Sequence, residues 1–201
     1  MPPAQLTLTC ATQPPPVSGV TTSADHPAGT AGAVTLNGTT GYLRTAGPAL
    51  NTTQSYTVSA WAKLTSLATT QTVLSQATIK HQAFYLGYSS SKSAWYFMTT
   101  TSDAATTTFP HAYGGTATAG TWTHITGVYD ADSNIMSLYV NGTLASSAAV
   151  NTTPVYNSTA PLTIGANLTL GTTSLYNQVS GSISDVRAFP AALTQDEIAH
   201  L

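Results

Sequence analysis

Residues 121–142, TWTHITGVYDADSNIMSLYVNG, contain two stretches in which polar and apolar side chains alternate. A polar segment at residues 130–134 separates them, and Asn141-Gly142 follows the second stretch. Alternation with a period of two predicts strands that bury one face, and a short polar connection predicts an antiparallel hairpin. Asn-Gly is the pair that tight hairpin turns favour. This part of the chain is therefore restricted to antiparallel β-structure.

The whole chain is poor in charge and rich in residues typical of strands and turns. Asp, Glu, Lys and Arg make up only 6% of its 201 residues, against about 25% in an average soluble domain. Threonine, which favours strands, and glycine, which favours turns, are frequent in their place. A chain of this length can bury one large core, and β-sandwiches of this size often form a single domain. We therefore predict an all-β antiparallel sandwich.

One helix is predicted, at the end of the chain. Thr194 and Glu197 match a capping box, in which the Thr hydroxyl accepts an N–H of the first turn and the Glu carboxylate reaches back. A short helix should follow, to His200 or Leu201. The side chains that we expect in the core, from the hairpin and from other strand-like segments, are Trp61, Trp122, Val128, Leu138, Val140, Ile164 and Ile183.

Five segments resemble the laminin G-like branch of the concanavalin A-like jelly rolls and occur in that family's order. The hairpin supplies W-x-H, G-V-Y-D and L-Y-V-N-G. The others are TLNGTTGYLRT, SYTVSAWAKL, PLTIGA and GSISDVRAFPAALTQDEIAHL, at residues 35–45, 55–64, 161–166 and 181–201. The resemblance implies a two-sheet antiparallel jelly-roll β-sandwich over residues 20–201, with residues 1–19 as an N-terminal strand or linker segment.

The same resemblance implies a setting outside the cell. Such domains usually belong to secreted bacterial multidomain proteins, so we expect a secreted chain with neighbouring domains. Met1-Pro2-Pro3 has no basic region leading into an apolar stretch, and no apolar run approaches the roughly twenty residues that cross a bilayer. Membrane insertion is therefore not expected. Cys10 has no second cysteine to pair with in this sequence; it either pairs outside it or is a small buried hydrophobe.

Charge argues against two classes of function. A net charge of −2 and a pI near 6.1 do not fit nucleic-acid binding, which needs several cations on one face. Relatives of this fold that hydrolyse β-glucans carry two acidic residues close together on one strand. Here the single glutamate, Glu197, is explained by the helix cap, and Asp130 and Asp132 straddle a turn. The chain is therefore predicted not to be an enzyme, with Asp130 and Asp132 as solvated turn residues rather than a catalytic pair.

A calcium site is implied by the resemblance. In many laminin G-like jelly rolls one structural Ca²⁺ links the N-terminal loop to the last strand. The corresponding ligands here are Asp25, the carbonyls of Asn37 and Gly38, and Asp185, which suits an ion that accepts oxygen atoms from distant loops. Relatives often have I-D-D or I-D-E where residues 183–185 read Ile-Ser-Asp. The site would then be weak or lost, with Asp25 an ordinary turn residue.

A ligand site is predicted among aromatic side chains in the middle of the chain. Aromatic rings stack on the C–H groups of sugars, while amides and hydroxyls supply directional hydrogen bonds. Alternation over residues 84–87 does not tell which side chains point outward. The residues that we expect at the ligand are Trp95, His111, Tyr113, Tyr176 and Asn177.

Three functions follow from these predictions. The first is a non-catalytic extracellular module that binds carbohydrate or another cell-surface ligand. The second is a structural spacer between domains, and the third is a cryptic glycoside hydrolase. Fold alone does not distinguish them, because function depends on the site that a fold carries.

Overall fold

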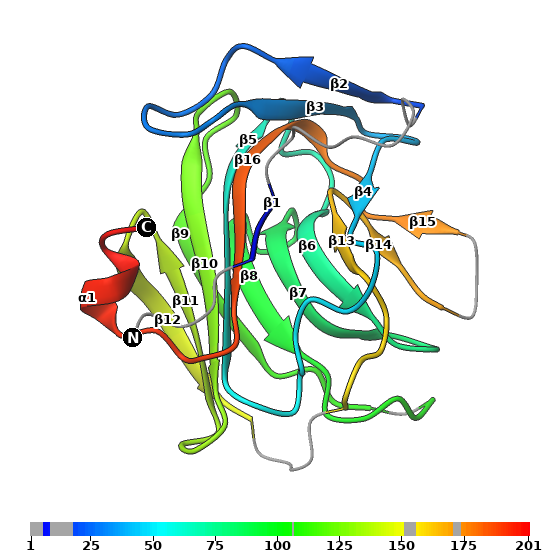
Figure 1. Ribbon diagram of the computed structural model, residues 1–201, viewed down its shortest axis with the longest axis vertical. Helices are drawn as coiled ribbons and strands as arrows, with labels where there is room; N and C mark the ends of the chain where they lie inside the picture. Colours follow the sequence, from blue (N-terminus) through cyan, green and yellow to red (C-terminus); the bar gives the residue numbers. More distant parts are fainter. Residues whose placement is uncertain (1–5, 9–17, 106, 151–155, 171–173) are drawn as a thin grey trace.

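The computed structural model describes residues 6–8, 18–105, 107–150, 156–170 and 174–201. Two antiparallel sheets, one of eight strands and one of six, pack face to face around a shared core. One short helix lies beside the eight-stranded sheet (Figure 1). The predicted jelly-roll sandwich is thereby confirmed. Cys10 and most of the predicted N-terminal segment 1–19 lie outside the described residues.

The eight-stranded sheet has the order β12-β11-β10-β5-β16-β3-β2, and β1 also pairs with β16. Its strands are β1 (Leu6–Leu8), β2 (Val20–Ser23), β3 (Ala33–Asn37), β5 (Tyr56–Leu64), β10 (Thr123–Asp130), β11 (Ile135–Val140), β12 (Thr143–Ala149) and β16 (Ser180–Phe189). β3 pairs with the first half of β16, and β1 pairs with the second half. The strand β16, which separates β5 from β3 and β1 within this sheet, therefore comes from the C-terminal region.

The six-stranded sheet has the order β4-β13-β6-β7-β8-β9. Its strands are β4 (Leu43–Arg44), β6 (Gln71–Ala77), β7 (Gln82–Ser89), β8 (Ala94–Thr99), β9 (His111–Thr116) and β13 (Leu162–Ile164). A small hairpin of β14 (Asn167–Leu168) and β15 (Leu175–Tyr176) follows β13. In Figure 1 it lies at the right, beyond the end of the sheet.

The predicted hairpin is β10 and β11, joined by residues 131–134. The next turn, into β12, contains Asn141 at φ 49° and Gly142 at φ 74°. Two successive positive φ angles are what a type I′ turn requires, and this turn suits the right-handed twist of the strands that it joins. The Asn-Gly pair therefore fixes the β11–β12 connection, as its sequence indicates.

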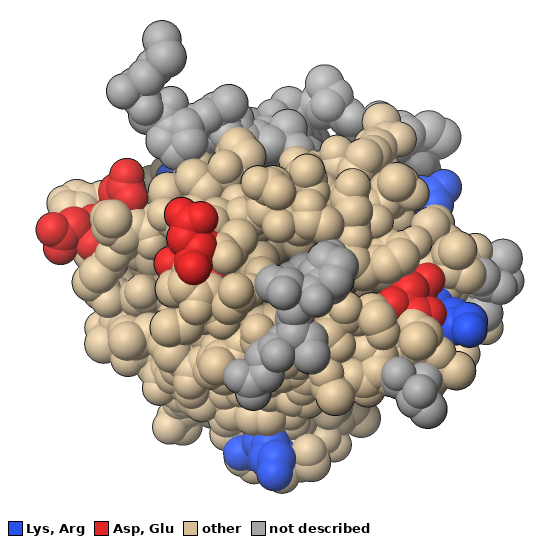
Figure 2. Space-filling model, turned by 90° about the horizontal axis from the view of Figure 1, so that it is seen from below, with Lys and Arg blue, Asp and Glu red and all other residues tan. Residues whose placement is uncertain are grey.

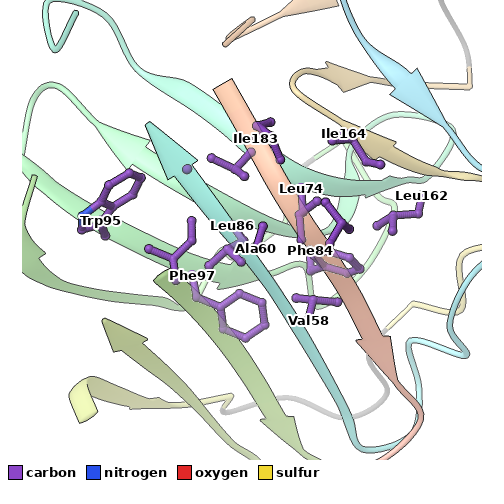
Figure 3. Packing of buried hydrophobic residues seen from close by; sticks show 14 of the residues in the cluster. Val58, Ala60, Leu74, Phe84, Leu86, Trp95, Phe97, Leu162, Ile164 and Ile183 are labelled. Atoms are coloured by element: carbon purple, nitrogen blue, oxygen red, sulfur yellow. The ribbon is translucent and has the colours of Figure 1, made fainter. Parts of the chain in front are cut away.

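The core lies between the inner faces of the two sheets. Figure 3 shows Val58, Ala60 and Ile183 of the eight-stranded sheet together with side chains of the six-stranded sheet, which include Leu74, Phe84, Leu86, Trp95 and Phe97. Phe97 packs directly on the backbone of Gly127, where an added Cβ would lie 2.3 Å from a ring carbon. Glycine in the G-V-Y-D motif is therefore a packing requirement, because any side chain there would displace the ring.

Four of the seven predicted core residues are buried, namely Val128, Leu138, Ile164 and Ile183. Val128 belongs to a separate cluster, on the outer face of the eight-stranded sheet, with Phe189, Leu193 and Ile198. Trp61, Trp122 and Val140 are only half-buried. The prediction was wrong for Trp61, in β5, and for Trp122, which directly precedes β10. Both strands are buried on both faces over most of their length, so alternation did not identify the inner face, which in β10 carries Ile125 and Tyr129.

The C-terminal helix α1 (Gln195–Ile198) begins at the predicted capping box, with Thr194 as its N-cap. It ends earlier than predicted, at Ile198, and Ala199 is its C-cap. Its buried residue Ile198 packs on the outer face of β10 through the cluster that contains Val128. The helix therefore covers one part of the outer face of the eight-stranded sheet.

Charged side chains are few and scattered on the surface that Figure 2 shows. The two salt bridges among the described residues join Lys63 to Asp25 and Arg187 to Asp185. In the same residues, no helix is long and apolar enough to cross a membrane. The surface thus lacks the concentrated positive charge that binds nucleic acid.

Candidate functional site

Several of the aromatic side chains of the predicted site lie on the outer face of the six-stranded sheet. In β7, Phe84 and Leu86 point into the core, so Tyr85 between them points outward. In β8, Trp95 and Phe97 are core residues, which places Tyr96 on the outer face for the same reason. The register of the strands therefore settles the orientation that alternation left open.

Two cross-strand rows form this face. In the first row Tyr85 pairs with Met98, and Met98 pairs with His111. In the second row Gly87 pairs with Tyr96, and Tyr96 pairs with Tyr113. Directly opposed residues in a sheet have neighbouring side chains on one face. We call the set Tyr85, Tyr96, Met98, His111 and Tyr113 the aromatic face.

The rings on the aromatic face contact one another. His111 and Tyr113 are stacked, with centroids 5.1 Å apart and an interplanar angle of 10°. Tyr96 and Tyr113 are 6.2 Å apart and tilted by 47°. Stacked and tilted pairs at such distances stabilise one another beyond their shared burial. The rings are therefore held in place before any ligand binds.

Burial sets the protonation of these groups. Desolvation raises the pKa of Tyr85 to about 12. It also raises the pKa of Tyr96, whose hydroxyl shares a 3.1 Å hydrogen bond with Thr72. His111 is half-buried, and its pKa is lowered first by desolvation and second by the charge of Lys92. Near neutral pH the face therefore presents uncharged phenols and a neutral imidazole, with one ammonium group nearby.

Residues 165–170 and 174–179 border the aromatic face on the side of β6. Ser75 donates a 3.0 Å hydrogen bond to the carbonyl of Ala166, and the N–H of Leu170 donates to the carbonyl of Thr78. The N–H of Thr72 donates to the carbonyl of Asn177 over 2.8 Å. Thr72 in turn pairs with Gly87 of the second row. Asn177 therefore lies at one end of this row, and Tyr113 lies at the other. Tyr176, next to it, is 54% exposed.

Four of the five predicted ligand residues therefore border one face of one sheet: His111, Tyr113, Tyr176 and Asn177. Trp95 does not, because it points into the core and is 1% exposed. Tyr85, Tyr96 and Met98 belong to the face but were not predicted as ligand residues. The sequence spacing of these residues could have indicated them, since each alternates with a large apolar residue of the same strand. The sequence did not show which of the two alternating sets of side chains faces the core.

The predicted calcium ligands are not brought together. Asp25 follows the end of β2, where Ser23 pairs with Ala33 and Ala33 with Ser184. Asn37 lies at the other end of β3, four residues from Ala33, which is about 13 Å along a strand. Asp185 lies near Ser184, so it shares an end of the sheet with Asp25 but not with Asn37 and Gly38.

The two carboxylates are also engaged by cations. Asp25 accepts hydrogen bonds from Lys63 and, at 3.1 Å, from Trp122 Nε1, and these contacts lower its pKa. Arg187 donates to both oxygens of Asp185, at 3.0 and 2.8 Å. The side-chain oxygen of Asn37 accepts three backbone N–H groups of its own turn. Across the described ranges no group of three His, Cys, Asp or Glu side chains is placed to hold a metal. These residues do not fit a Ca²⁺ site.

Two of the acidic side chains that were weighed for catalysis, Asp130 and Glu197, have structural partners. Asp130 accepts from Ser133 Oγ at 2.7 Å and from the N–H of Asp132, and the Ser133 bond is the main cause of its lowered pKa. Glu197 accepts from the N–H of Thr194 at 2.8 Å within the helix cap. The ring of buried His124 lies against Trp61, with centroids 5.2 Å apart and a tilt of 43°, and desolvation lowers the pKa of His124 to about 4. Asp130 and Glu197 act as caps.

A shallow pocket of about 290 Å³ lies elsewhere, between residues 48–51 and 157–159. Its lining contains no charged side chain. The carbonyls of Leu50 and Ser158, which lie in its walls, accept hydrogen bonds from Gln76 Nε2. These bonds hold the two loops against β6, so the pocket is explained by loop packing.

Residues 37–199 match the family model described as the concanavalin A-like lectin/glucanases superfamily, of laminin G type. The chain belongs to this superfamily, and the predicted resemblance is confirmed. No curated protein matches the sequence at a significant level.

Solved structures with the same fold include glycan-binding modules. The CBM40 domain of the Ruminococcus gnavus IT-sialidase, bound to α2,3-sialyllactose, is 16% identical, with a TM-score of 0.60 over 73% of this chain and 81% of that one. A heptameric SAP-like pentraxin from Limulus polyphemus is 20% identical, with a TM-score of 0.65 over 83% and 79%. Domain 4 of the Geobacillus stearothermophilus GH43 arabinanase AbnA, in complex with arabinotriose, is 22% identical, with a TM-score of 0.59 over 84% and 75%. These similarities establish the fold.

Proposed function

We propose that this chain is a non-catalytic binding module whose ligand is a glycan, held on the aromatic face. The observation that carries the proposal is the stacked pair His111–Tyr113, joined through Tyr96 to a floor of outward-facing side chains. Exposed ring faces attract the C–H surface of a sugar, and hydroxyl and amide groups at the borders add hydrogen bonds. The presence of CBM40 and an arabinanase module among proteins of this fold supports it.

The proposal assigns no catalytic role. Asp130 and Glu197 are used as turn and helix caps, and a glycosidase needs two carboxyl groups that flank the bond it cleaves. We propose further that the domain works outside the cell, within a longer protein. A uniformly polar surface with few charges suits such a module.

Affinity should be weak, because the aromatic face is shallow and a small exposed site offers little area. Dissociation constants in the micromolar to millimolar range are typical of such sites, about −4 to −8 kcal/mol. The test is a glycan-array screen followed by calorimetry on each hit. Tyr113→Ala should weaken binding by about 1 to 2 kcal/mol, since it removes one stacking ring.

The matched control is Tyr156→Ala. Tyr156 is half-buried, as Tyr113 is, but its carbonyl bonds to Thr52 in the loops beside β6, away from the aromatic face. Its replacement should leave glycan affinity unchanged. Absence of binding to any glycan, or equal effects of the two substitutions, would reject the site and favour a spacer. Turnover of a glycan would reject the non-catalytic assignment.

A further inference from the structure

Strand β9, which carries His111 and Tyr113, is the last strand of the six-stranded sheet, and within that sheet it pairs only with β8. Its other side lies against the eight-stranded sheet, at β12 and at the end of β11. An edge strand leaves half of its backbone groups outside the ladder of its own sheet. Packing against β12 must therefore hold β9 in place on its free side.

A glycine makes the close approach of β9 to β12 possible. An added Cβ at Gly114 would lie 2.9 Å from the Cβ of Ala145 in β12, 2.9 Å from the carbonyl oxygen of Ala145 and 3.1 Å from its carbonyl carbon. Two of these three atoms belong to the backbone of β12, which cannot turn aside as the end of a side chain can. Closely packed protein interiors leave no room for such an addition. The two strands can therefore lie this close only with glycine at position 114.

The next residue bends β9 where it meets the other sheet. The pairing of β8 with β9 shifts between Ala94 and Trp95, and Gly115 is the extra residue in β9. It has φ 70°, the left-handed conformation that glycine adopts in one common type of β-bulge. An added Cβ there would lie 2.7 Å from the side chain of Val140 in β11. A bulge bends its strand, so β9 bends at its contact with β11 and β12.

The contact with β12 lies directly behind the stacked rings. Side chains alternate along a strand; Ala112 is a core residue, and Gly114 pairs with the core residue Trp95. Positions 112 and 114 therefore face inward, while His111 and Tyr113 face outward. The inward side of β9 rests on β12, and its outward side presents the two rings.

We propose that Gly114 is a positioning residue of the aromatic face: its contact with Ala145 fixes how far β9 stands from β12, and thereby where His111 and Tyr113 stack. Ordinary van der Waals contact of a Cβ begins at 3.4 Å, against the 2.9 Å available here. Any side chain at position 114 would thus move the strands apart by roughly 0.5 Å, which is about the tolerance of a preorganised binding site. The effect on ligand affinity rests on the proposed function, whereas the effect on the rings does not.

The test compares Gly114→Ala with the wild type by NMR. The ring of Tyr113 shields the stacked imidazole of His111, so the Hε1 resonance of His111 reports on their stacking. In Gly114→Ala this resonance should move towards its position in Tyr113→Ala, where the stack is lost. Ala145→Val presses on the same contact from β12 and should move the resonance in the same direction. Valine favours strands, so this second variant should fold even if Gly114→Ala does not.

Gly19→Ala is the matched control. Its added Cβ would lie 2.4 Å from the side chain of Asn37, beside β2, which forms the opposite edge of the eight-stranded sheet from β12. The substitution should therefore lower the melting temperature without moving the His111 resonance. An equal movement of the resonance in Gly19→Ala, or an unchanged resonance in both Gly114→Ala and Ala145→Val, would overturn the proposal.

Glycan affinity is the second measurement. Gly114→Ala should weaken binding by about two- to tenfold, since a displaced ring loses part of its stacking on the ligand, and folded Gly19→Ala should bind as the wild type does. If the wild type binds no glycan while Gly114→Ala still moves the resonance, the proposed function fails and the positioning role of Gly114 stands. Unchanged affinity together with a moved resonance would overturn the role of this contact in binding.

Discussion

The imidazole of His111 and the ring of Tyr113 lie parallel, with 5.1 Å between their centroids, on one face of β9. They are two residues apart on an edge strand, so their side chains project to the same side of the sheet. Edge position leaves the pair accessible, while Met98 and Tyr96 on the next strand support it from one side. The pair thus forms the β9 border of the aromatic face.

Conservative changes at Tyr113 should separate stacking from hydrogen bonding. Tyr113→Phe keeps the ring and should retain most of the glycan affinity, whereas Tyr113→Ala should lose about 1 to 2 kcal/mol. Calorimetry on one glycan measures both. Melting temperatures should change little, because Tyr113 lies outside the core. If Tyr113→Phe is as weak as Tyr113→Ala, the hydroxyl is what holds the ligand.

His124 should make stability depend on pH. Burial lowers the pKa of His124 from its ordinary value of 6.5 to about 4. The charge of Asp185 raises this pKa slightly, and the charge of Arg187 lowers it. The unfolded chain binds the proton more readily, so folding stability should be complete above pH 6.5 and fall as the pH decreases towards 4. The loss is on the order of 3 kcal/mol at most.

Urea unfolding at several pH values between 4 and 7 measures this effect. His124→Phe keeps a ring against Trp61 and cannot take up a proton, so its stability should change much less over that range. Carboxylates with lowered pKa, such as Asp25 and Asp130, contribute at lower pH, below about 4. An equal slope in both proteins between pH 6.5 and 4 would show that another group titrates there.

Gly127→Ala should destabilise the fold. The new Cβ would lie 2.3 Å from the ring of Phe97, and overpacking of a core typically costs about 1 to 3 kcal/mol. Gly47→Ala is the control, because no atom lies within 4 Å of its added Cβ. Denaturant unfolding should show a loss for Gly127→Ala and at most a small change for Gly47→Ala. Similar stability in both would mean that Phe97 can move aside.

Calcium should not change the melting temperature. The carboxylates of Asp25 and Asp185 are paired with Lys63 and Arg187, and a metal would have to displace these cations. A ligand that binds only the folded state raises its stability by RT ln(1 + [L]/Kd). Thermal melts in millimolar Ca²⁺ and in EDTA should therefore coincide. A rise in calcium that Asp25→Ala removes would contradict this expectation.

Local patterns predicted the hairpins well because their signals lie within a few residues. Asn141-Gly142 and the Thr194–Glu197 capping box each specify a turn or cap through neighbouring atoms, and both occur as predicted. The family resemblance supplied the sandwich. Neither the local patterns nor the family resemblance determined which strands are neighbours in each sheet. The neighbours of a strand decide which of its side chains are buried.

The site was predicted only in part for this reason. His111 and Tyr113 share a face by spacing alone, but the inward direction of Trp95 depends on the core across from it. The two half-buried tryptophans, Trp61 and Trp122, are large and apolar, yet they lie outside. Likewise, the salt bridge between Asp25 and Lys63 joins a residue beyond the end of β2 to one in β5, and no local pattern predicts it.

The position of β16 has a consequence for how the chain acquires its structure. β5 pairs with one side of β16, while β3 and β1 share the other. The eight-stranded sheet thus consists of two parts that touch only through a strand encoded near the C-terminal end. Contacts between segments so far apart in sequence slow folding. During synthesis, the edges of β5, β3 and β1 that pair with β16 therefore remain unpaired until residues 180–189 emerge from the ribosome.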